Sequence, residues 1–263
     1  MFLEDELHAA YKFGNAPILD FPFPHFYVEN IFSENFYSKI QENLLDPNEM
    51  ISMAELYNDN PGLSGYKERM VMDFDKKESM QKAGKDKREF WTSFHKNFSP
   101  HFNNILRVKF KKFLDMRFMY LKNVSYTHSL QLVNDKKNYS LGPHTDQPSK
   151  VVSVLIYLPK DCAQISTGTS IYMPKDPSKL NKELPHLHYA REDFYKVITM
   201  PYAPNSALCF IKTNNSFHGV EKLEMEETDR WSLQYNIHIT QETADQETAA
   251  RNEHRKAQSN FSI

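Results

Sequence analysis

The second half of the chain carries the clearest pattern of hydrophobic and polar positions. Short segments rich in β-branched and aromatic residues follow one another there, and turn-forming residues separate them. Segments of this kind predict strands of an antiparallel sandwich or barrel, because a parallel sheet would need a helix between successive strands. We expect strands at residues 124–133, 151–158, 169–173, 195–200, 207–212 and 231–239.

The first half shows helical spacing instead. Aromatic and aliphatic residues recur at helical intervals in 85–98 and 102–118, and these aromatics are expected to pack against the sheet. A third amphipathic helix is expected at 34–45. The proline-punctuated stretch 21–28 predicts an extended strand, and the many turn formers in 46–70 predict a long surface loop. The chain therefore reads as a helical N-terminal region followed by a mainly β core.

Composition narrows the class of protein. The 263 residues include only 7 glycines and neither a G-x-G-x-x-G nor a G-x-x-x-x-G-K-[ST] motif, which argues against a dinucleotide-binding domain or a P-loop. Two cysteines cannot form a disulfide framework or a Cys-rich zinc site. The formal charge of −2 gives no reason to expect nucleic acid as a partner, and the apolar stretches are too short to span a membrane. The N-terminus is acidic and lacks the features of a signal peptide, so a cytoplasmic location is expected.

Three candidate metal ligands stand out in the second half. His144 and Asp146 form an H-x-D pair in the segment LGPHTD. In an extended chain, residues two positions apart face the same way, so the imidazole and the carboxylate could share one metal ion. His218 follows the strand expected at 207–212. Two histidines and one carboxylate make the facial triad of non-haem Fe(II) oxygenases, which leaves coordination positions open for a co-substrate and O2.

A candidate anion-binding pair begins the last expected strand. Arg230 and Ser232 alternate onto one face, and a guanidinium fork beside a hydroxyl suits the carboxylate of a dicarboxylate. An arginine on a mostly apolar strand needs an anionic partner, because burying it unpaired is costly. A purely structural alternative is that Arg230 pairs with Glu226, Glu227 or Asp229 on the surface of a hairpin.

In this order and spacing, His144-x-Asp146, His218 and Arg230-x-Ser232 resemble the iron(II)- and 2-oxoglutarate-dependent oxygenases, in particular their prolyl-hydroxylase-like branch. The resemblance covers about residues 123–240. It implies a double-stranded β-helix (a jelly-roll, cupin-like fold) with the H-x-D at the end of the second core strand, the distal histidine on the seventh and the arginine on the eighth. The implied division is an N-terminal extended segment with helices in 1–122, the catalytic core in 123–240, and a polar helix or tail in 241–263.

The resemblance also implies the chemistry. His144, Asp146 and His218 would bind Fe(II), and Arg230, helped by Ser232, would bind the distal carboxylate of 2-oxoglutarate. Gln131 would face this co-substrate, although an ordinary outward-facing glutamine fits the sequence equally well. The expected reaction consumes O2 and hydroxylates an unactivated C–H bond, with desaturation as a variant, and it releases succinate and CO2. Its substrate is expected to be a polar small molecule, or else a sugar or peptidyl group.

Other interpretations stay open at this point. A cupin-like metal-binding protein or a zinc hydrolase could use the same three ligands, but neither needs a dicarboxylate anchor such as Arg230. His186 and His188 alternate like a second metal pair, yet no carboxylate accompanies them, and decoration of a long loop is the preferred interpretation. Lys150 could contact substrate, with surface solvation as the favoured alternative.

Overall fold

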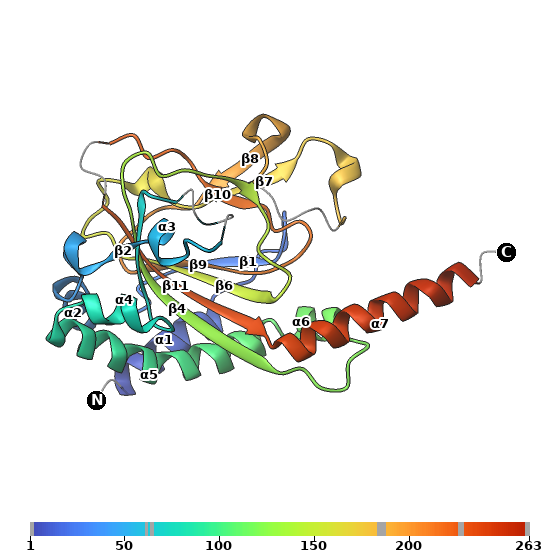
Figure 1. The fold of residues 1–263 in the computed structure, drawn as a ribbon, viewed down its shortest axis with the longest axis horizontal. Coiled ribbons are helices and arrows are strands. Elements are labelled where there is room, and N and C mark those ends of the chain that lie inside the picture. The colour runs from blue at the N-terminus through green and yellow to red at the C-terminus, as the bar shows by residue number, and fades with distance from the viewer. Residues whose placement is uncertain (1–2, 61–62, 64–65, 183–187, 226–228, 261–263) are drawn as a thin grey trace.

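The computed structural model describes residues 3–60, 63, 66–182, 188–225 and 229–260 (Figure 1). Its α-helices are α1 (Leu3–Asn15), α2 (Glu34–Glu42), α3 (Met53–Leu56), α4 (Lys77–Lys82), α5 (Lys85–Lys109), α6 (Lys111–Arg117) and α7 (Gln241–Asn260). Its strands are β1 (His25–Glu29), β2 (Ile51–Ser52), β3 (Arg69–Asp73), β4 (Tyr126–Asp135), β5 (Leu141–His144), β6 (Lys150–Tyr157), β7 (Ser170–Pro174), β8 (Phe194–Thr199), β9 (Ser206–Ile211), β10 (His218–Val220) and β11 (Arg230–Ile239).

These strands form two antiparallel sheets. The major sheet has the order β1-β9-β6-β11-β4-β3-β2, and the minor sheet has the order β5-β10-β7-β8. From β4 onward, successive strands alternate between the two sheets, except that β7 and β8 are neighbours in the minor sheet. This is the topology of a double-stranded β-helix. The predicted fold class, a mainly β jelly roll preceded by a helical region, is therefore confirmed.

The outer face of the major sheet packs against helices. Figure 1 shows α1 and α5 on the side of this sheet that faces away from the minor sheet. Side chains that point outward are apolar, as at the cross-strand pair Leu132 and Leu233, and they share one core cluster with Phe98 and Phe102 of α5. The expectation that these aromatic residues pack against the sheet is confirmed.

The inner face of the major sheet, which faces the minor sheet, is polar instead. Every second residue of β11 lines one cavity of about 500 Å³, together with residues of the minor sheet. These β11 residues are Arg230, Ser232, Gln234, Asn236 and His238. A sandwich that only enclosed a core would carry apolar side chains here. The alternation along one strand thus separates a helix-covered core from a polar chamber.

The helices expected at 85–98 and 102–118 are divided differently in the structure. α5 continues through Pro100 to Lys109, and α6 follows directly. A proline inside a helix removes one hydrogen bond and usually kinks or ends the helix. Here Phe98 and Phe102, on either side of Pro100, are fully buried and hold both halves of α5 in the core. The expected interruption between residues 98 and 102 was wrong.

The loop expected at 46–70 also differs from the structure. β2 and α3 fall within it, and β3 begins at Arg69. β3 pairs with β4, with Val71 opposite Val133, so it extends the major sheet. Local composition cannot indicate a pairing between segments so far apart in the sequence. The N-terminal region therefore contributes strands to the core sheet as well as helices, and β1 lies in the stretch expected to be extended.

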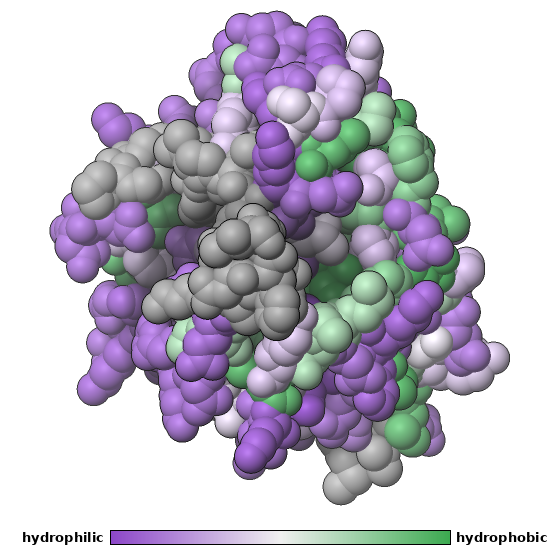
Figure 2. Space-filling view, turned by 90° about the vertical axis from the view of Figure 1, so that its right-hand side faces the viewer, coloured by the Kyte–Doolittle hydropathy of each residue, from purple (hydrophilic) through white to green (hydrophobic). Residues whose placement is uncertain are grey.

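The final segment forms helix α7, which extends away from the body of the molecule (Figure 1). Its first half is tied to α6 by an ion pair of 3.0 Å between Glu247 and Arg117. No helix within the described ranges is long and apolar enough to cross a membrane. The face shown in Figure 2 is mainly hydrophilic, with hydrophobic residues gathered toward one side.

Candidate active site

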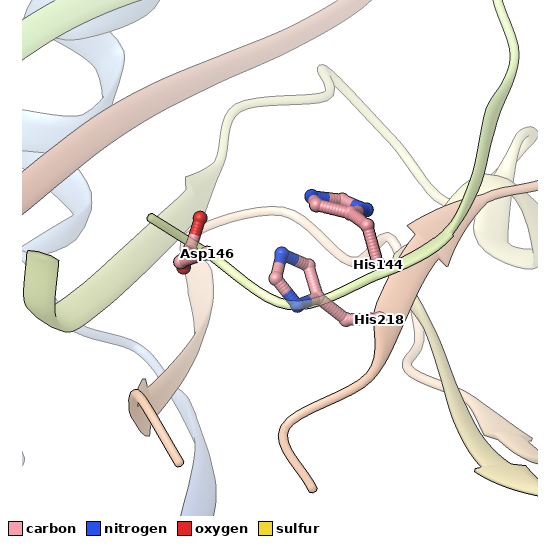
Figure 3. Close-up of side chains that lie close together, drawn as sticks. All are labelled: His144, Asp146 and His218. Carbon is pink, nitrogen blue, oxygen red and sulfur yellow. The ribbon is translucent and has the colours of Figure 1, made fainter. Parts of the chain in front are cut away.

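The three candidate metal ligands converge in the structure. His144 ends β5 and lies directly opposite His218, the first residue of β10, with 4.3 Å between the ring centroids. Asp146 follows two residues after His144, and all three side chains are buried. Each offers one ligand atom, and these atoms lie within 4.8 Å of one another (Figure 3). The strand positions are those expected from the resemblance, the second and the seventh of the core.

Backbone carbonyls set the orientation of both imidazoles. His144 Nδ1 lies 3.0 Å from the carbonyl oxygen of Gly142, and His218 Nδ1 lies 2.9 Å from that of Ser216. Because a carbonyl oxygen can only accept, Nδ1 carries the proton in each ring, and Nε2 is the basic nitrogen. Burial lowers the pKa of His144 well below its usual range. A neutral imidazole held in a fixed tautomer is what a divalent metal requires of histidine.

Asp146 is held by two neighbours on β6. Lys150 Nζ donates to Oδ1 at 2.8 Å, and Ser153 Oγ donates to Oδ2 at 2.6 Å. Burial alone would raise the pKa of Asp146, but the positive charge of Lys150 outweighs it and keeps the pKa well below its usual range. The preferred interpretation of Lys150 as a solvated surface residue was wrong, since it contacts a candidate metal ligand.

The chain approaches itself closely beside the two histidines. A Cβ atom built on Gly219, the residue after His218, would lie 2.4 Å from the carbonyl oxygen of Leu141 on β5. Only glycine therefore allows β10 to approach β5 here without displacing the backbone. This accounts for the glycine in the segment SFHGV and for the pairing of His144 with His218.

Arg230 belongs to a buried cluster of three charged residues. Its Nη1 donates to Asp135 Oδ2 at 2.7 Å, and its Nε donates to the carbonyl oxygen of Thr167 at 2.6 Å. Asp135 also accepts two bonds from Arg69, at 2.6 and 3.1 Å. Arg69, Asp135 and Arg230 are in register across β3, β4 and β11. Two guanidinium groups thus share one carboxylate, which leaves one positive charge in excess.

The surface alternative for Arg230 is not what the structure shows. Asp229 bonds to Lys136 and Asn134 instead, while Glu226 and Glu227 lie outside the described residues. The arginine exposes only 2% of its surface and lines the cavity.

Two buried hydroxyl groups face the same cavity. Ser232 Oγ and Tyr139 Oη have no hydrogen-bond partner within the part of the chain that the structure describes. The guanidinium of Arg69 lies over the Tyr139 ring, 4.3 Å from its centroid. Ser232 was expected from the sequence, whereas Arg69 and Tyr139 were missed. The short apolar run MVM in the segment RMVMD could have indicated a strand at Arg69, but no local signal marks Tyr139.

Two further sequence candidates also line the cavity. Gln131, on the inner face of β4, donates from Nε2 to Asp73 Oδ2 at 2.6 Å and to Tyr57 Oη at 3.1 Å. His188 lies beside His144, with 5.0 Å between ring centroids. From the sequence, His188 was expected to be an ordinary residue of a long loop, but the structure places it at the wall of the cavity. Its expected companion His186 lies outside the described residues.

The known proteins to which this chain is similar are all solved structures. No protein-family model matches the chain, and no curated protein matches it. EvdO2 from Micromonospora carbonacea var. aurantiaca, complexed with 2-oxoglutarate, is 15% identical, with a TM-score of 0.47 and coverage of 88% of this chain and 89% of that chain. HygX from Streptomyces hygroscopicus, with nickel, 2-oxoglutarate and hygromycin B bound, is 12% identical, with a TM-score of 0.41 and coverage of 82% and 83%.

A Pseudomonas putida prolyl-4-hydroxylase is also similar, at 10% identity and a TM-score of 0.40, with coverage of 89% of this chain and 99% of that chain. These structures are of the kind that the sequence motif indicated. At such identities and TM-scores they decide nothing about the activity of this chain, which has to be argued from its own side chains.

Proposed function

We propose that the protein is an Fe(II)- and 2-oxoglutarate-dependent dioxygenase that hydroxylates an unactivated C–H bond of a polar small molecule. Succinate and CO2 are the other products. One observation carries this proposal. The possible metal ligands His144, Asp146 and His218 share one cavity with Arg230, whose buried cluster has an unbalanced positive charge. Metal and co-substrate, when bound, supply the oxidising chemistry that no side chain provides.

The donor set fits iron. Two neutral nitrogens and one carboxylate are the ligands of the facial triad, and they leave positions for a chelating co-substrate. All three residues are more than nine-tenths buried. The carbonyl oxygens of Gly142 and Ser216 hold the Nδ1 atoms of the two histidines, and Ser153 holds one carboxylate oxygen of Asp146. The protein thus holds these ligands in place before any metal arrives, which limits the reorganisation that binding requires.

The cluster at Arg230 fits the distal carboxylate of 2-oxoglutarate. A buried excess of one positive charge is costly, and a carboxylate would neutralise it. Ser232 Oγ and Tyr139 Oη could then donate hydrogen bonds that the described residues do not use. A zinc hydrolase or a cupin-like binding protein would have no use for this arrangement. We therefore assign Arg230, with Ser232, to the co-substrate.

The side chains of the chamber define what the protein itself contributes. Arg230 and Ser232 would orient the co-substrate along β11, and Asp146 would keep its carboxylate directed at the metal through Ser153 and Lys150. Gln131 is occupied by Asp73 and Tyr57, so it shapes the wall beside the substrate. The polar inner face of the major sheet suits a hydrophilic substrate better than a hydrocarbon.

Calorimetric titration with Ni(II), which does not turn over, tests the proposal. The metal-loaded protein is expected to bind one 2-oxoglutarate per chain, and the metal-free protein to bind it far more weakly. Asp146→Ala should lose both metal and co-substrate, whereas Asp229→Ala, at an exposed acid, should lose neither. Equal binding of 2-oxoglutarate with and without metal would refute the proposal.

A further inference from the structure

The cavity contains a buried carboxylate that the proposed function does not use. Asp73, the last residue of β3, exposes 4% of its surface and lines the cavity. Its Oδ1 accepts from the backbone N–H of Asp75 at 2.9 Å, and its Oδ2 accepts from Gln131 Nε2 at 2.6 Å and from Tyr57 Oη. Both oxygens therefore act as acceptors, as those of an ionised carboxylate do.

All of these donors are neutral. The described residues provide Asp73 with no ion pair within 4.0 Å. Lys76, three residues after Asp73, also lines the cavity, but its ammonium group lies over the ring of Tyr57, 5.3 Å from the centroid of that ring. Burial raises the pKa of Tyr57, and the charge of Asp73 raises it further, so Tyr57 stays a donor. A buried negative charge held only by neutral groups is a favourable place for a cation.

A second observation concerns the same part of the cavity. Asn236 lines the cavity, and its amide is open to it: no side-chain hydrogen bond joins it to the described residues, and it is not among their buried unpartnered atoms. Asn236 lies in register between Ser129 on β4 and Ser153 on β6, and Ser153 bonds to Asp146. An amide that opens into a cavity can both donate to and accept from the polar groups of a ligand bound there.

The register connects the two observations. Gln234, two residues before Asn236 on the same face, is in register with Gln131, and Gln131 is in register with Asp73. Polar groups therefore follow one another across the floor of the cavity from Asp73 toward the candidate metal ligands. From β3 to β6 there are three strand spacings, about 14 Å in all. An amino sugar would cover about half of this distance and an extended six-carbon amino polyol somewhat more, and side chains at the two ends reach over the rest.

We propose that the substrate is a small hydrophilic amine whose ammonium group binds to Asp73, while Gln234 and Asn236 bind its hydroxyl or amide groups. This inference rests on the proposed function, because it takes the same cavity as the place of oxidation. The ammonium–carboxylate contact would be charge-assisted and largely desolvated, which favours an amine over a neutral analogue of equal shape.

Matched pairs of small molecules test the inference. Ligand-observed NMR on the full chain, loaded with Zn(II) and 2-oxoglutarate, would compare glucosamine with N-acetylglucosamine, and lysine with Nε-acetyllysine. The members of each pair differ in the charge of one nitrogen and in one acetyl group, and Asp73→Asn separates the effect of the charge from that of the size. Wild-type protein is expected to bind at least one free amine about tenfold more tightly than its acetylated counterpart, within the millimolar range of such fragments. Asp73→Asn should remove this preference, and Asp176→Asn, at an exposed loop acid, should keep it.

Three results would overturn the inference: equal binding within every pair, a preference that survives Asp73→Asn, or no binding of any amine up to about 10 mM. The comparison within wild-type protein does not depend on how well the variant folds. Calorimetry with 2-oxoglutarate separates the two proposals. Asp73→Asn is expected to bind 2-oxoglutarate as wild type does, so a failure confined to the amines contradicts only the amine site.

Discussion

Arg230 and Asp135 lie directly opposite each other on β11 and β4 and form a buried ion pair, with 2.7 Å between Nη1 and Oδ2. Arg69 also binds the carboxylate of Asp135. One negative charge therefore faces two guanidinium groups, and the cluster keeps one positive charge. The positive charge left over lies in the chamber that contains His144, Asp146 and His218. This relationship explains how one end of a polar cavity could select a dicarboxylate.

Arg230→Ala is expected to weaken 2-oxoglutarate binding by about 10- to 100-fold, because it removes a charge-assisted contact and the surplus charge together. Arg69 and Asp135 would remain as a balanced pair, so metal affinity and folding should change little. Calorimetry on Ni(II)-loaded protein measures both affinities. Arg88→Ala, which removes a guanidinium on α5 outside the cavity, is the control. Loss of metal with unchanged co-substrate binding would show that the roles are misassigned.

Asp135→Asn should destabilise the fold by about 3–5 kcal/mol, because it leaves two buried guanidinium groups without a counter-charge. Urea denaturation measures the free energy of unfolding. The matched control, Asp229→Asn, changes an acid whose side chain is 61% exposed, and it should stay within about 0.5 kcal/mol of wild type. Wild-type stability of Asp135→Asn would mean that the two guanidinium groups do not depend on Asp135 as their counter-charge.

Ser153→Ala is expected to lower metal affinity by about 10- to 100-fold, because Ser153 orients the carboxylate of Asp146. Ser129→Ala provides a close control, since Ser129 and Ser153 are both in register with Asn236 but Ser129 bonds to His238 instead. Competition with a fluorescent chelator gives the two affinities. Equal losses in both variants would point to a general effect of the cavity wall.

Glu49 gives the fold a defined dependence on pH. Burial would raise its pKa, but hydrogen bonds from the backbone N–H groups of Asp46 and Gly84 and from Lys87 outweigh this and lower the pKa to about 2. The folded state therefore prefers the ionised form more strongly than the unfolded state, whose pKa is near 4.5. This contribution is fully present above pH 4.5 and is lost as the pH falls toward 2.

Glu49→Gln should accordingly flatten the stability profile between about pH 4.5 and 2, relative to wild type, while it lowers stability at neutral pH. Chemical denaturation at a series of pH values measures this difference. Glu55→Gln, at an exposed acid, should follow the wild-type profile. If Glu49→Gln lost stability in parallel with wild type over this window, the hydrogen bonds to Glu49 would not be stabilising the fold.

Local patterns were enough to predict six of the eight core strands, all but β5 and β10, and to select residues that converge in the cavity. His144 and Asp146 are two positions apart, and Arg230 begins a strand whose alternation is visible, so short-range periodicity locates them. The encounter of His144 with His218 follows from the jelly-roll topology that the motif order implied, and the structure shows them paired across β5 and β10.

The groups around these residues could not be predicted in the same way. Asp135 and Arg69 meet Arg230 only because β3, β4 and β11 pair in one register, and no local pattern specifies a register between distant segments. Lys150 looks like any surface lysine until the turn after β5 brings it to Asp146. The interruption expected between residues 98 and 102 is absent for a related reason, since burial of Phe98 and Phe102 overrides the local helix-breaking tendency of Pro100.

The most direct test of the central claim is the visible spectrum of the protein with Fe(II) and 2-oxoglutarate under anaerobic conditions. Chelation of iron by the keto acid is expected to produce a weak metal-to-ligand charge-transfer band in wild type and in Arg88→Ala. The band should be absent in His218→Ala, and in Arg230→Ala it should need a much higher 2-oxoglutarate concentration. Wild-type protein that binds iron but shows no band at saturating 2-oxoglutarate would contradict the account.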